Sequence, residues 1–165
     1  MTGKIVIQKF ANEDGEYKRL ASSFRDTISI DGKFKPEPNR YHLYVSYSCP
    51  WAHRVLITRI LKGLTNIIEI TVVHWHMGKN GWRFATNEEG STEAIGSTPD
   101  PLYNFQRVKE LYFKADPHYQ GRFTVPILWD KKLETIVNNE SSEIIRILNT
   151  EFNSIIDEKF AKIDI

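Results

Sequence analysis

One stretch near the end of the first quarter of the chain constrains the fold more than any other, because it changes from strand to helical periodicity around a cysteine. Residues 41–46 include alternating polar and apolar side chains, which predicts a strand. The apolar residues within 50–62 recur at helical spacing, which predicts a helix. Ser48 is the expected N-cap, and Pro50 suits the first turn, where a missing N–H costs little. We therefore expect Cys49 at the N-terminus of a helix.

Cys49 is the single cysteine of the chain, so an internal disulfide is excluded. At a helix N-terminus, unpaired N–H groups and the helix dipole favour a negative charge. This setting promotes the thiolate, which is the nucleophilic form of cysteine. The alternative interpretation is an inert buried thiol, the commoner fate of a lone cysteine. Ala52 stands where a dithiol oxidoreductase would carry its second cysteine, so a partner thiol would have to come from another molecule.

The bulk composition indicates one soluble globular domain. The chain has 165 residues, 41% of them hydrophobic and 26% charged, which suffices for one domain with a proper core. The net charge of +1 gives no reason to expect binding to nucleic acid or to a membrane surface. No apolar run has the length of a membrane span, and the N-terminus lacks a signal-peptide core. We expect a cytoplasmic protein, with an organelle as the alternative.

The remaining periodicity predicts a thioredoxin-like α/β fold. We expect strands at 67–74, 123–129 and 133–137, a helix at 102–115, and a last helix that begins in a capping signature at 139–142. A long irregular segment, 75–101, interrupts this order, and such loops are usually functional or disordered. The expected organisation is an extended N-terminal arm (1–40), a domain with βαβ-α-ββα order (41–153), and a tail or linker (154–165).

Six motifs, in order along the chain, carry a family resemblance. They are Tyr41-His-Leu-Tyr-Val-Ser, Cys49-Pro-Trp-Ala-His-Arg, Asn80-Gly-Trp-Arg-Phe, Ala115-Asp-Pro-His-Tyr, Gly121-Arg-Phe-Thr-Val-Pro-Ile-Leu-Trp-Asp and Asn138-Asn-Glu-Ser-Ser-Glu-Ile-Ile-Arg. Over residues 24–153 the chain resembles glutathionyl-hydroquinone reductases, the omega-like glutathione transferases of the Xi class. Members of that family carry a second, all-helical domain, and the resemblance implies that this chain lacks it.

The resemblance implies glutathione as co-substrate and Cys49 as the nucleophile that takes glutathione from a glutathionyl-hydroquinone as a mixed disulfide. It implies a cis Val125–Pro126 bond facing the nucleophile, as in the thioredoxin fold. The Val125 N–H and C=O would then be free to pair with the cysteinyl backbone of glutathione. The alternative interpretation of Pro126 is a plain edge-strand proline.

Four further residues are carried over as glutathione contacts. Ser141 and the helix N–H groups beside it would bind the α-carboxylate of the γ-glutamyl group, and Glu140 would pair with its ammonium. Simple helix capping explains the same two residues and is compatible with that role. Trp82 would cover the peptide and Arg122 would meet a carboxylate. Their alternatives are a loop anchor and a solvated surface charge.

A metal site is not expected. His74 and His76 lie two apart and, with Cys49 and His53, could suggest zinc, but the spacing is not that of a structural site. Two other functions stay open. One is an omega-type thioltransferase or dehydroascorbate reductase acting on small disulfides, and the other is a non-catalytic interaction module. A homodimer is a further expectation, because an apolar surface meant for a helical domain would be exposed.

Overall fold

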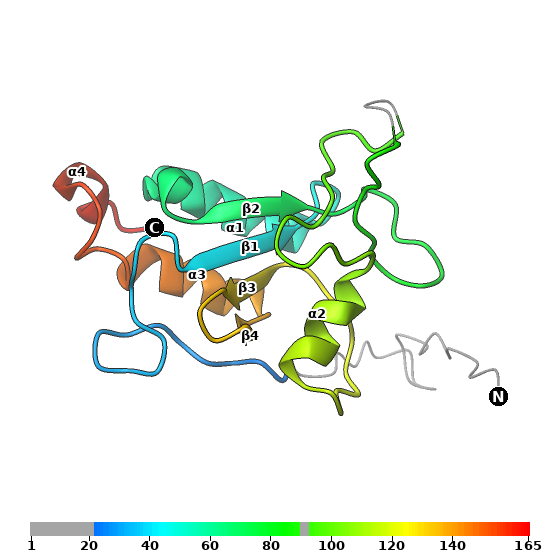
Figure 1. Ribbon diagram of the computed structural model, residues 1–165. Coiled ribbons are helices and arrows are strands. Elements are labelled where there is room, and N and C mark those ends of the chain that lie inside the picture. The colour runs from blue at the N-terminus through cyan, green and yellow to red at the C-terminus, as the bar shows by residue number, and fades with distance from the viewer. Residues whose placement is uncertain (1–21, 90–92) are drawn as a thin grey trace, which may run out of the picture.

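The computed structural model describes residues 22–89 and 93–165 (Figure 1). Its centre is a four-stranded mixed sheet with the strand order β2-β1-β3-β4. Helices pack on the sheet, and long irregular segments gather at the end where β1 and β2 finish (Figure 1). This arrangement is the thioredoxin-like α/β sheet that the sequence predicts.

The strands pair in the register that this topology requires. β1 (Tyr41–Val45) is parallel to β2 (Glu69–Val72) and antiparallel to β3 (Ile127–Asp130), which is in turn antiparallel to β4 (Thr135–Asn138). The parallel pair is joined by a helical crossover, as parallel neighbours must be. β3 and β4 form the predicted hairpin.

Helices occur on both sides of the sheet. α1 (Pro50–Leu61) and α3 (Ser141–Thr150) contact each other on one side, whereas α2 (Val108–Ala115) contacts β4. A short 3-10 helix, η1 (Leu64–Asn66), follows α1, and a one-turn helix, α4 (Glu158–Ala161), lies near the C-terminus. α1 follows β1 and α3 follows β4, so the two helices run in the same direction with their N-termini at the same end of the sheet (Figure 1).

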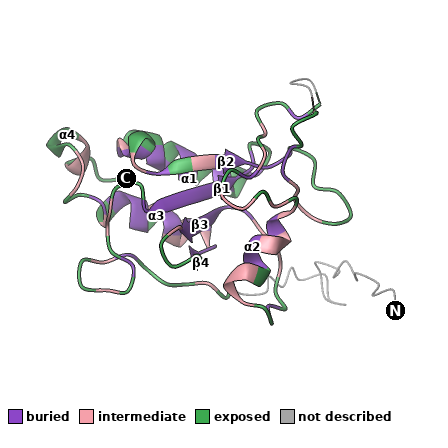
Figure 2. Cartoon of the chain, viewed as in Figure 1, coloured by how far each residue is buried: buried purple, intermediate pink, exposed green. Residues whose placement is uncertain are grey.

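All five residues of β1 are buried, although the sequence alternates polar and apolar side chains there (Figure 2). The reason is that both faces of this strand are covered, so the polar side chains are enclosed as well. His42 is 1% exposed and contacts Thr71 Oγ1 through Nε2 at 2.7 Å. Tyr44 donates from its hydroxyl to the buried Asp100 carboxylate at 2.9 Å. The core therefore contains hydrogen-bonded polar pairs among its aliphatic and aromatic side chains, although the other ring nitrogen of His42, Nδ1, has no hydrogen-bond partner among the described residues.

The predicted helix at 102–115 is six residues too long at its start, since α2 begins only at Val108. The Asp100 carboxylate accepts the backbone N–H groups of Leu102, Tyr103 and Phe105, at 3.2, 3.1 and 3.2 Å. These bonds fold residues 100–105 into a compact turn, in which Asn104 has a φ of 56°. A carboxylate that binds local N–H groups competes with helix formation.

The segment predicted as a strand at 123–129 is extended only from Ile127 onward. The Val125–Pro126 bond is cis, as expected, and lies directly before β3. Pro126 therefore removes no donor from the sheet ladder, which answers the objection to a proline inside a strand.

Part of the expected arm lies along β4. Asp26 N–H donates to Val137 O at 3.1 Å, and Asn139 N–H donates to Phe24 O at 3.1 Å. The Asn138 side-chain amide adds a bond to Asp26 O at 3.0 Å. These contacts cover the outer edge of β4, which would otherwise expose unpaired backbone groups.

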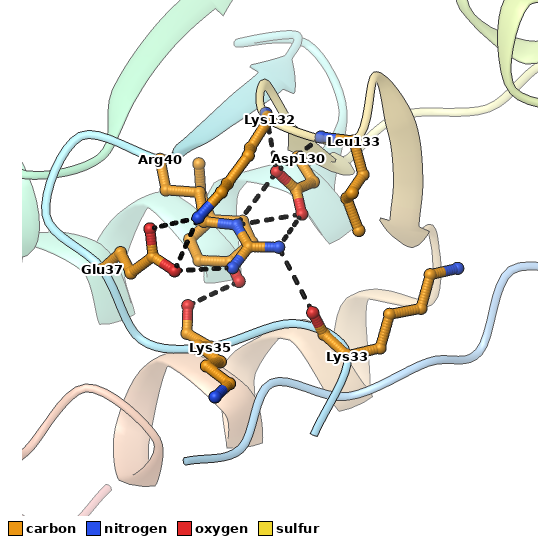
Figure 3. Close-up of polar contacts among 8 residues, drawn as sticks. Lys33, Lys35, Glu37, Arg40, Asp130, Lys132 and Leu133 are labelled. Atoms are coloured by element: carbon orange, nitrogen blue, oxygen red, sulfur yellow. Dashed lines mark hydrogen bonds and ion pairs between the residues drawn. The ribbon is translucent and has the colours of Figure 1, made fainter. Parts of the chain in front are cut away.

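A buried ion pair joins the end of the arm to the hairpin (Figure 3). Arg40 donates from Nε to both carboxylate oxygens of Asp130, at 3.1 and 3.0 Å, and from Nη1 to Glu37 at 2.9 Å. Asp130 is fully buried and also accepts the backbone N–H groups of Lys132 and Leu133. The carboxylate thus shapes the hairpin turn and neutralises the arginine.

Residues beyond α3, expected as a tail, contact the end of α1. Lys62 is 0% exposed, and its Nζ donates to Ile163 O at 2.6 Å. Gly63 has a φ of 64°, and a Cβ built on it would lie 2.3 Å from the Phe160 ring. Only glycine accommodates both this backbone angle and this approach. No helix in residues 22–89 and 93–165 is both long and apolar enough to cross a bilayer.

Candidate active site

Cys49 is the N-cap of α1, with Pro50 as the first helical residue. Its backbone N–H donates to Ser46 O at 3.1 Å, and its carbonyl accepts the N–H of His53 at 3.0 Å. The prediction of Ser48 as N-cap is therefore wrong by one residue. The Ser48 hydroxyl instead donates to Trp75 O at 2.7 Å and ties this turn to the long loop. The sulfur is therefore carried by the N-cap residue itself. This residue is 8% exposed.

The loop before β3 faces this cysteine. Cys49 Sγ lies 3.5 Å from Val125 O, the carbonyl that precedes the cis bond to Pro126. The thiol donates to that oxygen. The prediction that the Val125 carbonyl is free is therefore wrong. The Val125 N–H makes no hydrogen bond within the described part of the chain. The residue whose carbonyl contacts the sulfur therefore also carries a backbone donor that has no partner in residues 22–89 and 93–165.

The start of α3 brings the predicted Glu140 and Ser141 to the same end of the sheet. Glu140 is the N-cap, and its carboxylate accepts the Ser142 N–H at 3.5 Å, which confirms the predicted capping signature. Ser141 is 2% exposed, and its Oγ accepts a hydrogen bond from Arg54 Nη2 at 2.9 Å. Arg54 lies on α1, five residues after Cys49. No role for Arg54 is predicted from the sequence, because nothing local to α1 indicates a contact with a residue so distant along the chain.

Trp82 and Arg122 are both partly buried and come from loops. Trp82 packs against the core, and its backbone carbonyl accepts the N–H of Val108 at 3.1 Å, which holds the backbone of this residue at the start of α2. The Arg122 carbonyl accepts from the Tyr119 hydroxyl at 2.8 Å. Nothing in these contacts brings either side chain onto the sulfur, and their assignment to glutathione stays a prediction.

Metal ligation finds no support among the residues described. No group of three or more His, Cys, Asp or Glu side chains in residues 22–89 and 93–165 is placed to hold a metal ion. His74 uses both ring nitrogens within the loop, with Nε2 3.0 Å from Glu93 O and Nδ1 accepting the His76 N–H at 3.1 Å. Two open cavities, of about 240 and 210 Å³, lie elsewhere, and Cys49 lines neither of them.

Comparison with known proteins places this geometry in a family. Residues 48–151 match the family model described as "Glutathione S-transferase, N-terminal domain". The chain is 55% identical over 154 residues to Glutathione S-transferase omega-like 2 of Schizosaccharomyces pombe, covering 93% of this chain and 47% of that protein. It is 49% identical over 149 residues to Glutathionyl-hydroquinone reductase YqjG of Escherichia coli, covering 86% of this chain and 44% of that protein.

A solved structure agrees with these relatives. The Xi glutathione transferase ECM4 from Saccharomyces cerevisiae, in complex with glutathione, superposes with a TM-score of 0.83 and 46% identity. The match covers 91% of this chain and 51% of that one. The chain spans about half the length of the curated relatives it matches. Since the family model matches more than half of the chain, this protein belongs to the glutathione S-transferase family and carries that family's N-terminal domain.

Proposed function

We propose that this chain forms the glutathione-binding half of an enzyme that reduces glutathionyl-hydroquinones through a Cys49–glutathione mixed disulfide. The observation that carries the proposal is the position of Cys49 as the N-cap of α1, facing the cis Val125–Pro126 loop. A relative named as a glutathionyl-hydroquinone reductase and a neighbour solved with glutathione support the choice of substrate.

The chemistry follows thiol exchange at sulfur. The Cys49 thiolate attacks the glutathionyl sulfur, the bond from that sulfur to the ring carbon breaks, and the ring carbon takes a proton to give the hydroquinone. The ring is thereby reduced by two electrons, and two sulfur atoms, the Cys49 thiolate and the thioether sulfur of the adduct, are oxidised to a Cys49–glutathione disulfide. A second glutathione thiolate then attacks this disulfide, which releases oxidised glutathione and regenerates the Cys49 thiolate.

The peptide part of glutathione has a complementary surface. The unpaired Val125 N–H would donate to the cysteinyl carbonyl of glutathione, as one added strand does. Ser141 and the first N–H groups of α3 would receive the γ-glutamyl carboxylate, since a helix N-terminus favours an anion. Glu140 would meet the ammonium group, Trp82 would cover the peptide, and Arg122 would meet the second carboxylate.

Intact-protein mass spectrometry after incubation with oxidised glutathione at neutral pH tests the proposal. We expect one glutathionyl adduct per chain, because Cys49 is the single cysteine. Cys49→Ser should fold, since serine is a good N-cap, and should form no adduct and support no turnover. A wild-type chain that stays unmodified while an unstructured thiol peptide reacts would refute the proposal.

An omega-type thioltransferase or dehydroascorbate reductase is the second candidate, which the name of the omega-like relative favours. The two candidates differ in the bond that is cleaved, carbon–sulfur in one and sulfur–sulfur in the other. Turnover of a glutathionyl-hydroquinone and of a simple mixed disulfide, measured on the same protein preparation, separates them. Absence of any adduct at Cys49 would instead favour a non-catalytic interaction module.

A further inference from the structure

A cavity of about 210 Å³ is lined by residues of the segment between β2 and α2, which is drawn in green in Figure 1, and Cys49 is not part of its lining. Its lining is rich in positive and titratable side chains, namely His74, His76, Lys79, Arg83 and Arg107, and contains no carboxylate. The whole chain carries a net charge of only +1. Such a concentration of one sign therefore reflects a local arrangement and not the average surface.

The other cavity, of about 240 Å³, provides an internal comparison. It is lined by Arg25 and Arg146 together with three carboxylates, Asp26, Glu143 and Glu151. Its lining contains charges of both signs, so it offers no preference for an anion. Two cavities of similar size thus differ chiefly in the sign of the charge at their walls.

Backbone pairing forces two of the cations together. Arg83 and Arg107 are partners in an antiparallel bridge, flanked by the bonds Phe84 N–H to Gln106 O and Val108 N–H to Trp82 O. This is the non-hydrogen-bonded type of pair, in which the Cα atoms lie about 4.5 Å apart and the side chains share a face. Like charges directly opposite each other destabilise such a pair.

Only one of these two arginines is neutralised by a described residue. Arg83 pairs with Glu89, whose carboxylate also accepts the Thr86 N–H at 2.7 Å. The Arg83 hydrogen bond lowers the pKa of Glu89 to about 2, so this carboxylate is ionised at neutral pH. Arg107 forms no ion pair with any residue in 22–89 or 93–165, and Glu110, its nearest acid in sequence, accepts backbone N–H groups instead.

Residues 78–81 also line the cavity and add a further cation, Lys79. Gly81 has a φ of 81° and donates to Gly78 O at 3.0 Å, which makes a tight turn with Lys79 at its tip. A Cβ built on either glycine would meet no atom within 4 Å, so a ligand has room there. Lys79 likewise forms no ion pair with another residue in the described ranges. The ring of His74 is held by its two hydrogen bonds within the loop, so His74 lines the cavity without being assigned a contact with the ligand.

We propose that this cavity is an oxyanion-binding site, in which Arg107 and Lys79 hold a carboxylate or phosphate group beside the Arg83–Glu89 pair. A bound oxyanion would neutralise the arginine that the bridge places opposite Arg83, and a guanidinium can bind such a group through two parallel hydrogen bonds. The site does not depend on the chemistry of Cys49. Its failure and the failure of the proposed function are therefore separate results.

A titration of the ¹⁵N-labelled chain with inorganic phosphate, followed by NMR at constant ionic strength in chloride, tests this site. We expect saturating shifts of the amide signals of Gly78, Gly81, Arg83 and Arg107. Arg107→Gln should raise the phosphate dissociation constant by about tenfold or more, because hydrogen bonds to charged groups are the stronger class. Lys79→Gln should weaken binding as well, and it serves as the second variant if Arg107→Gln does not fold.

Arg146→Gln is the matched control, because it removes an arginine from the cavity that also contains carboxylates. We expect this control to leave phosphate affinity unchanged. Shifts that never saturate, or an equal loss of affinity in Arg146→Gln, would overturn the proposal. Equal binding in wild type and in both cavity variants would do the same.

A second set of titrations determines whether the bound oxyanion is part of the substrate or a free anion. Glutathionyl-hydroquinones with and without a ring carboxylate are titrated into wild type and Arg107→Gln. A loss of affinity confined to the carboxylated compound identifies a substrate-borne group, whereas a response to phosphate alone identifies a free anion.

Discussion

Replacing Asp130 by alanine removes one partner of the buried ion pair with Arg40. The Asp130 carboxylate is fully buried, and it accepts Arg40 Nε at 3.0 Å and the Lys132 N–H at 2.8 Å. The substitution leaves the guanidinium, whose side chain is 5% exposed, without its main counter-charge. It also leaves backbone donors of the hairpin turn unpaired.

The expected cost is large. Removal of one partner of a buried pair destabilises a protein by about 3–5 kcal/mol. Glu37 stays 2.9 Å from Arg40 Nη1 and compensates part of the charge, so we expect the lower end of this range, about 3 kcal/mol. For a domain of this size, each kcal/mol shifts Tm by roughly 2–4 °C, which predicts a fall of about 6–12 °C.

Urea unfolding followed by circular dichroism measures this change. Lys162→Ala is the control, because it breaks an ion pair with Glu158 whose two side chains are 73% and 79% exposed, and it should cost under about 1 kcal/mol. The double variant Arg40→Met with Asp130→Leu should recover much of the loss, because no buried charge then remains. If Asp130→Ala costs no more than the control, the attribution of stability to this pair is wrong.

Three further changes have definite expected outcomes. Gly63→Ala should lower the free energy of unfolding by more than about 1 kcal/mol, because the residue has a φ of 64° and faces an aromatic ring, and an unchanged thermal midpoint would contradict this. Burial lowers the pKa of His42 from 6.5 to about 4, and the Arg83 hydrogen bond lowers the pKa of Glu89 from 4.5 to about 2. The unfolded chain therefore binds more protons than the folded one below about pH 6.5, so stability should fall between pH 6.5 and 4 and again between 4.5 and 2. Urea midpoints measured across this range test it, and a constant midpoint from pH 6.5 to 4.5 would refute the assignment for His42. Ile57, Ile60 and Leu61 are all exposed on α1, so we expect concentration-dependent self-association that Ile60→Lys reduces, and elution of wild type as a monomer at every concentration would argue against it.

The elements that the sequence predicted well are those determined by local chemistry. A proline directly after Cys49 fits only the first turn of a helix, and α1 does begin there. The β-branched run at 67–74 contains β2, and the capping residues at Glu140 begin α3. In each case the residues that specify the element lie within it or beside it, so the pattern is readable without the fold.

The errors come from contacts that are distant along the chain. The expected helix at 102–115 begins only at Val108, because the Asp100 carboxylate accepts hydrogen bonds from local N–H groups and from the Tyr44 hydroxyl on the central strand. Ser48 does not cap α1, because its hydroxyl donates to the backbone carbonyl of Trp75 in the long loop. The contact between Arg54 and Ser141 joins residues on two helices that no local pattern relates. Such contacts can be recognised only once the topology of the sheet is known, because the topology determines which ends of the helices and strands lie together.

The parallel course of α1 and α3 has an electrostatic consequence. Two adjacent helices that point the same way place their positive dipole ends together, and these ends repel each other. A sulfur anion at one terminus and a carboxylate at the other would cancel that repulsion. An anionic tripeptide should therefore bind more tightly than an uncharged analogue of the same shape, and the helix pair would be most stable when the site is occupied.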